Sequence, residues 1–249
     1  MGLDDAKKSS SNEPELYLGD LQKTEVIFQL VKVPHGERDE NWQKSLLANI
    51  AQASFRCGDP QVIKGPDGFP YFQLFLPEPG QSFQCFVIEK MAADFLLSSG
   101  FGVVLNPTIH QVDWVLSAGD VLNYHLNKEF YTIGKTPFSK ATANEIIPKE
   151  EQVMIGQPAE SLLPAVTRQL LHTLLNRNGI AEPKVLLMMR KNKDGTDISQ
   201  DLVFNFTPQS FDSENRYKSV MRALSWYLPR HYSFVGMDEQ ALGDGFMLL

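Results

Sequence analysis

The sequence predicts an α+β fold in two small units, each with helices packed on a mainly antiparallel sheet. Two observations support this prediction. Short apolar runs bounded by turn residues alternate with longer segments whose apolar residues recur at helical spacing. Residues 132–152, which include Gly134, Pro137 and Pro148, lack both patterns and are typical of a connection between units. A chain of 249 residues is long enough to bury two cores.

The first unit is expected over residues 16–131, after a polar, disordered arm at 1–15. An apolar run from Val26 that stops at Pro34 predicts its first strand. The next element is predicted to be a helix over 41–54, because its apolar residues share one helical face: Trp42, Leu46, Leu47, Ile50 and Ala53.

The middle of this unit contains a strong turn signal at residues 65–68, followed by an apolar strand at 71–76 that Pro77 closes. The dense apolar residues of 83–97 predict a short strand that turns into a helix.

The end of the first unit is predicted to hold two neighbouring strands, at residues 101–105 and 112–116. Ser117 then begins a helix, with Asp120 at the capping-box position three residues later.

The second unit, expected over residues 153–249, has the predicted order α-β-β-α-β. An apolar stripe from Leu162 to Leu175 predicts a helix that Asn178-Gly179 ends. The next elements are predicted in order as a hairpin of strands 185–189 and 202–206, a helix capped by Ser213, and a strand at 232–235. The apolar tail 246–249 is expected to pack into a groove or to join a sheet edge, its own or a partner's.

Two short motifs carry a resemblance to a known family. The first is Gly100-Phe101-Gly102-Val103-Val104-Leu105-Asn106-Pro107, and the second is Ile155-Gly156-Gln157-Pro158 with Glu160 and Pro164. With the order of elements, they resemble the enhanced serine sensitivity (SseB) family of bacterial proteins over roughly residues 40–240. The resemblance implies a non-enzymatic cytoplasmic protein and does not indicate what it binds.

Candidate binding residues come from these motifs and from the basic hairpin of the second unit. They are Asn106, Pro107, Gly156, Gln157, Pro158, Arg190 and Lys191.

Charge and composition exclude several classes of function. The net charge is −7, and residues 1–150 carry 13 basic and 19 acidic side chains. Because an acidic surface repels phosphate, nucleic acid is not an expected partner. No run approaches a membrane span, the N-terminus lacks the apolar segment of a signal peptide, and Cys57 and Cys85 have no metal or redox spacing. These features predict a cytoplasmic protein.

No catalytic, metal or cofactor signature stands out. Gly100 and Gly102 precede a strand, whereas the glycines of a dinucleotide fingerprint follow one. His125 and Glu129 share the spacing of metal ligands but have no recognisable third ligand, and Cys57 lies beside Arg56 without a catalytic motif. We therefore assign no catalytic residue, metal ligand or cofactor.

Three functional hypotheses follow. The leading one is a non-catalytic module that binds an unidentified protein or small ligand. The alternative is an enzyme with an active site in the cleft between the units, since such clefts often bind ligands. The third is a homo-oligomer formed through the C-terminal tail.

Overall fold

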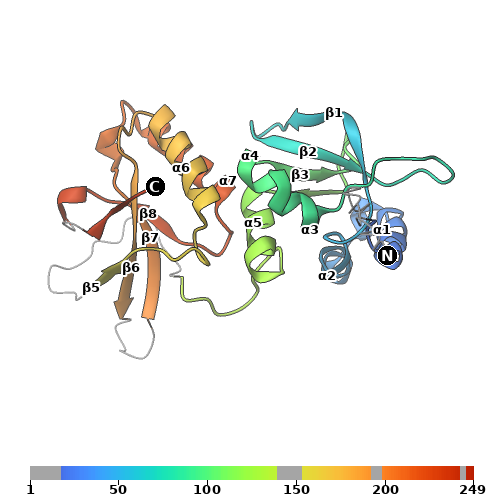
Figure 1. The fold of residues 1–249 in the computed structure, drawn as a ribbon, viewed down its shortest axis with the longest axis horizontal. Coiled ribbons are helices and arrows are strands. Elements are labelled where there is room, and N and C mark those ends of the chain that lie inside the picture. Colours follow the sequence, from blue (N-terminus) through green and yellow to red (C-terminus); the bar gives the residue numbers. More distant parts are fainter. Residues whose placement is uncertain (1–17, 139–152, 192–197, 242–244) are drawn as a thin grey trace, which may run out of the picture.

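The fold consists of two units that lie side by side, each a sheet with packed helices (Figure 1). A computed structural model describes residues 18–138, 153–191, 198–241 and 245–249. It confirms the predicted α+β class, with one sheet in each unit. The predicted arm at 1–15 and the tip of the predicted hairpin lie outside the described residues.

The first sheet has the order β1-β2-β3-β4 and is mixed. Its strands are β1 (Arg56–Lys64), β2 (Pro70–Phe75), β3 (Gly102–Leu105) and β4 (Trp114–Leu116). The β1–β2 and β3–β4 pairs are antiparallel, whereas β2 and β3 are parallel. Strand β1 was not predicted, because its register shifts between Cys57 and Val62 and this bulge hides the alternation of a regular strand.

In the described part of the first unit there are five α-helices and two short helical turns. They are α1 (Leu21–Val31), the 3₁₀ turn η1 (His35–Glu37), α2 (Glu40–Asn49), α3 (Ile88–Met91), which continues through a π-helical turn (Ala92–Leu96) into α4 (Leu97–Ser99), and α5 (Ala118–Asn127). Their apolar faces form a core with one face of the sheet, around Leu46, Phe55 and Leu74.

The strand predicted at residues 26–33 is wrong, because this segment is helix α1. The Asp20 side chain accepts hydrogen bonds from the backbone N–H groups of Gln22 and Lys23 and so caps the helix. Thr24 and Ile27 are the buried residues, at a helical spacing of three. The apolar residues suit a strand, but the cap and this spacing determine the structure.

The predicted capping box of Ser117 and Asp120 is confirmed. Ser117 Oγ accepts from the Asp120 N–H, and an Asp120 carboxylate oxygen accepts from the Ser117 N–H, at 3.0 and 2.8 Å. The predicted helix over 41–54 is also present, as the shorter α2. In contrast, Phe86 forms only an isolated bridge with Phe55, so the short strand predicted before α3 is wrong.

The second sheet has the order β5-β6-β7-β8, with β9 also paired to β6. Its strands are β5 (Val153–Gly156), β6 (Lys184–Lys191), β7 (Ile198–Phe204), β8 (Phe234–Gly236) and β9 (Met247–Leu248). Its helices are α6 (Ala165–Arg177) and α7 (Glu214–Tyr227), with 3₁₀ turns at Pro208–Ser210 and Glu239–Ala241. The predicted α6, hairpin and α7 are confirmed, β5 was not predicted, and the tail joins its own sheet as β9.

Helices α6 and α7 lie between the second sheet and the first unit (Figure 1). Trp226 of α7 stacks on Phe69 with ring centroids 4.4 Å apart, and its indole N–H donates to the Gly100 carbonyl at 3.2 Å. Nearby, a Cβ on Gly119 of α5 would lie only 2.0 Å from the Leu228 carbonyl oxygen. The two units are therefore in direct contact, and the backbone at Gly119 packs against the backbone at Leu228.

Among the described segments, no helix combines the length and the apolar character that a membrane span needs.

Candidate functional site

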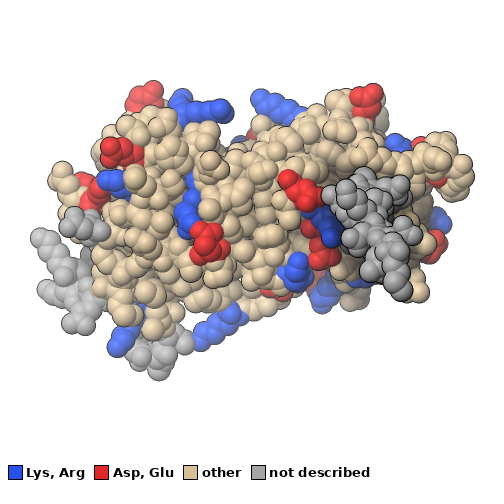
Figure 2. Space-filling view, viewed as in Figure 1, with Lys and Arg blue, Asp and Glu red and all other residues tan. Residues whose placement is uncertain are grey.

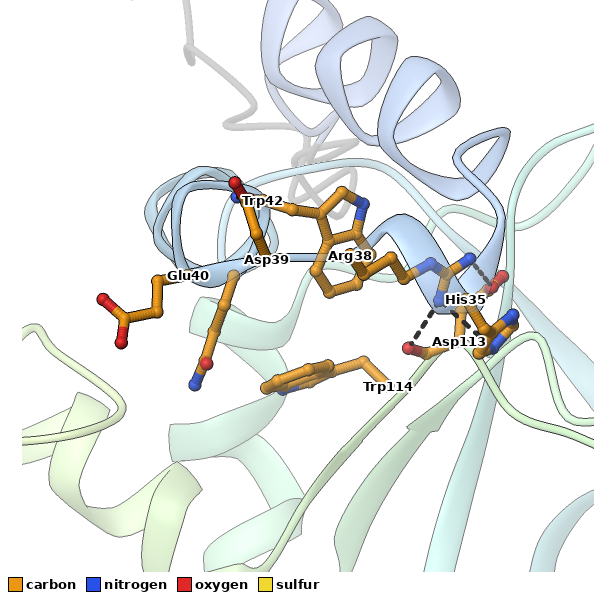
Figure 3. Close-up of a pocket in the computed structure, with 8 residues that line it drawn as sticks. His35, Arg38, Asp39, Glu40, Trp42, Asp113 and Trp114 are labelled. Atoms are coloured by element: carbon orange, nitrogen blue, oxygen red, sulfur yellow. Dashed lines mark hydrogen bonds and ion pairs between the residues drawn. The ribbon is translucent and has the colours of Figure 1, made fainter.

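An open hollow on the first unit, which we call the tryptophan groove, is the candidate site (Figure 3). It encloses about 620 Å³ and opens to solvent. It is lined by His35, Arg38, Asp39, Glu40, Trp42, Gln43, Asp113 and Trp114. Turn η1 and the start of α2 supply the first six of these residues, and the start of β4 supplies the other two.

The indole of Trp42 is held in place by a hydrogen bond and packs against the indole of Trp114. Trp42 lies on the inner face of α2 and donates its indole N–H to the Leu30 carbonyl at 2.8 Å. The rings of Trp42 and Trp114 are 5.6 Å apart at a tilt of 53°. The groove thus has an aromatic lining that belongs to the hydrophobic core below it.

Arg38 is structural. Its guanidinium donates to the carbonyls of Val31, Val33 and Asp113 and forms a 2.7 Å ion pair with the Asp113 carboxylate. Only 7% of its side chain is exposed, and its guanidinium lies 4.5 Å from the centre of the Trp42 ring. Because these bonds tie the η1 segment to β4, Arg38 closes one end of the groove.

His35 also joins the η1 turn to the first sheet. Its Nε2 lies 3.0 Å from the Val112 carbonyl oxygen, and Arg38 Nη1 lies 3.2 Å from the same nitrogen. A carbonyl can only accept and an arginine N–H can only donate, so Nε2 forms a hydrogen bond with one of these two groups in a given tautomer.

Asn106, a predicted binding residue, supports this end of the groove from behind. Its amide nitrogen donates to Asp113 at 2.7 Å, while its amide oxygen accepts from the Leu76 N–H at 3.1 Å. Its φ of 46° is a left-handed conformation that asparagine tolerates better than most residues. Asn106 therefore positions Asp113, and Pro107 begins the adjoining loop.

The acidic rim of the groove is formed by Asp39 and Glu40, both exposed. Asp39 caps α2 by accepting from the Trp42 N–H at 2.8 Å. Within the described parts of the chain, neither carboxylate forms an ion pair with a lysine or arginine. Since Arg38 is paired with Asp113, the rim keeps a net negative charge.

An exposed apolar side chain lies on the loop that leads into the groove. Ile109 is 96% exposed, on the loop between Asn106 and Asp113. The Thr108 hydroxyl accepts from the Gln111 N–H at 3.1 Å and donates to the Gln111 carbonyl at 2.9 Å. This closed turn presents Ile109 to solvent on an ordered backbone.

The remaining predicted binding residues lie in the second unit, away from Asn106. Gly156 ends β5 opposite Leu187, and Gln157 and Pro158 follow it. Arg190 of β6 forms a 3.2 Å ion pair with Asp201, which is 1% exposed, and Lys191 is exposed at the end of the same strand. The structure therefore does not bring the seven residues into one site, and a binding role for them stays a prediction.

The candidates for metal or covalent chemistry, His125, Glu129 and Cys57, do not line the groove. Among the described residues, no three His, Cys, Asp or Glu side chains form a group that would hold a metal ion. Cys57 is a half-buried free thiol that accepts from the Gln61 amide at 3.7 Å, and His125 is exposed. The alternative hypothesis placed an active site between the units, where Trp226 and Leu228 now pack against the first unit.

Charge on the visible surface is mixed. On the face that Figure 2 shows, Lys and Arg side chains are interspersed with Asp and Glu, and no continuous basic surface forms there. This view adds no support for a nucleic-acid partner.

Comparison with known proteins found no match for this chain, either to a family model, to a curated protein or to a solved structure. The resemblance to the SseB family accordingly stays a prediction.

Sequence reasoning missed the groove, although it identified parts of it. Trp42 was predicted to lie on the apolar face of a helix, and it is a core residue of α2. A signal in the sequence is that two of the chain's three tryptophans fall in the first unit close to acidic residues, Trp42 after Asp39 and Glu40 and Trp114 after Asp113.

Proposed function

We propose that this chain is a non-catalytic binding protein whose first unit takes up a segment of another protein in the tryptophan groove. The observation that carries the proposal is the pair of indole rings, Trp42 and Trp114, that line an open hollow of about 620 Å³. Aromatic side chains are enriched at protein interfaces because they bury a large area at little cost in conformational entropy.

The shape of the groove favours a chain segment over a small molecule. Small-molecule sites enclose most of their ligand, whereas this groove is open to solvent. Ile109, which is 96% exposed, lies on the loop that ends at Asp113 of the groove. The resemblance to the SseB family supports a non-enzymatic role, and with it we propose a cytoplasmic location.

The test is selection from a random peptide library on the full-length protein, followed by affinity measurement with a variant that fills the groove. Gln43→Trp places a large ring in the hollow, and Lys44→Trp, on the next and exposed residue of α2, is the matched control. We expect selected peptides to lose at least about tenfold in affinity for Gln43→Trp and to bind Lys44→Trp normally. Peptides that bind both variants equally, or no selected peptide at all, would show that the groove is not the binding site.

A further inference from the structure

We infer that the tryptophan groove receives a positively charged side chain, lysine or arginine, from a peptide segment whose neighbouring apolar residue contacts Ile109. This inference rests on the proposed function and names the chemistry of the partner. It is carried by the charge balance of the groove, its indole rings and the exposed isoleucine on the loop that ends at Asp113.

The first step is the charge balance. Three carboxylates and one guanidinium line the groove. The guanidinium of Arg38 is used internally, because three carbonyls and the Asp113 carboxylate accept from it and it is almost fully buried. An incoming anion would therefore find no free donor on Arg38. The charges that face solvent are those of Asp39 and Glu40.

Stabilisation of helix α2 accounts for only part of the role of the Asp39 and Glu40 carboxylates. Both lie at the N-terminus of α2, where negative charge is favourable, and Asp39 is the N-cap. The cap uses Asp39 Oδ1, while Glu40 accepts no hydrogen bond in the described structure, and its carboxylate lies at the outer edge of the groove (Figure 3). Glu40 is thus the carboxylate that a ligand would meet.

The second step is the aromatic lining. The face of an indole ring attracts cations, more strongly than phenylalanine or tyrosine. The groove already shows this preference, since the Arg38 guanidinium packs over the Trp42 ring at 4.5 Å. Trp114 lies across the groove from the start of α2 (Figure 3). A lysine or arginine entering the groove would have this ring on one side and the Glu40 carboxylate on the other.

The third step distinguishes a peptide from a free amine. Ile109 is 96% exposed although the turn that carries it is closed by Thr108 and Gln111. The loop connects Asn106 to Asp113, the residue that forms the wall of the groove. A free amine would contact the groove alone, whereas a peptide segment with an apolar residue near its basic one could contact both the groove and Ile109.

The experiment uses the selected peptides described above and two charge variants. Glu40→Lys reverses the charge of the groove, and Glu37→Lys makes the same change on an exposed residue outside it. We expect the selected peptides to share a lysine or arginine next to an apolar residue. Their affinity should fall at least about tenfold for Glu40→Lys and by less than about twofold for Glu37→Lys. Ile109→Ser should weaken the same peptides.

The outcomes separate this inference from the proposed function. Peptides that respond to Gln43→Trp but contain no basic residue, or are insensitive to Glu40→Lys, would overturn the inference and leave the groove as a binding site. Insensitivity to Gln43→Trp would overturn both. Glu40→Gln, which removes the charge and keeps the shape, replaces Glu40→Lys should the latter fail to fold, and it should weaken binding in the same direction.

Discussion

Arg230 of the second unit donates two hydrogen bonds to Asp120 of the first, from Nε at 2.7 Å and from Nη2 at 2.8 Å. Asp120 is completely buried, whereas the Arg230 side chain is 60% exposed. The hydrogen bond to Asp120 is the main reason that the pKa of Arg230 is raised above its usual value. Arg230 also lies 4.2 Å from the centre of the Tyr131 ring. The two units are therefore joined through a residue that also caps helix α5.

Arg230→Ala is expected to destabilise the protein by roughly 1–3 kcal/mol. The variant leaves the Asp120 carboxylate buried with only the Ser117 N–H as its partner among the described residues, and the estimate is reduced because Arg230 is largely exposed. Chemical unfolding measures the effect, with Arg216→Ala as a control on an exposed arginine of α7. Equal stability of the two variants would show that the ion pair contributes nothing to the junction.

Gly119→Ala is expected to destabilise the protein although it adds a better helix former. In a free helix, alanine is favoured over glycine by about 1 kcal/mol. Here the new Cβ would lie 2.0 Å from the Leu228 carbonyl oxygen, and overpacking against backbone costs about 1–3 kcal/mol or more. Gly36→Ala, whose Cβ meets nothing within 4 Å, is the control. Thermal unfolding gives the melting temperature of both variants, and we expect it to fall for Gly119→Ala. A raised melting temperature for Gly119→Ala would contradict the close contact with Leu228.

The sequence predicts those elements that local chemistry determines. Ser117 and Asp120 satisfy each other's backbone N–H groups, so their spacing alone identifies the start of α5. The hairpin of β6 and β7 was similarly recognisable, because two apolar strands flank a turn signal. Segments with competing signals were not predictable: the apolar residues of α1 suit a strand until the cap at Asp20 is considered.

The groove was not predictable because it joins residues that are distant in the chain. Arg38 and Asp113 are 75 residues apart, and nothing in the spacing of either indicates their ion pair. The same holds for Trp226, whose partner Phe69 lies in the other unit. Tertiary packing creates these contacts, whereas periodicity and capping report only on neighbours in sequence.

His231 gives the junction a pH dependence. Its ring packs edge-on against Phe138, and its Nδ1 is buried without a hydrogen-bond partner in the described part of the chain. Burial lowers the pKa of His231 below its usual 6.5, while the nearby Glu129 partly opposes this shift. The unfolded chain therefore takes up the proton more readily, so the contribution of His231 to stability is full above about pH 6.5 and falls as the pH drops below it.

The measurement is the free energy of unfolding of His231→Gln and the wild type at about pH 7.5 and 5.5. We expect the wild type to lose more stability than the variant on acidification, because the variant has no proton to gain at this position. His110→Gln, on an exposed histidine of the first unit, should behave as the wild type does. An identical loss in wild type and His231→Gln would remove His231 as a source of the pH dependence.

The C-terminal tail should stabilise its own chain without joining two chains. Strand β9 pairs with β6, the Leu249 N–H donates to the Pro183 carbonyl at 3.0 Å, and Met247 and Leu249 pack against the second core. Deleting residues 245–249 should therefore cost roughly 2–4 kcal/mol, from the loss of half-buried apolar side chains and strand pairing.

The mass in solution, measured by light scattering, should be the same for the full chain and for the chain without residues 245–249, because the partner of β9 is the same molecule's β6. A swapped strand would give the opposite result, since its removal would reduce an oligomer to monomers. Leu248→Ser is the control, because this side chain is 61% exposed and its change leaves the buried contacts of the tail intact. It should change neither mass nor stability by a measurable amount, so a strong effect of this variant would place Leu248 in an intermolecular contact.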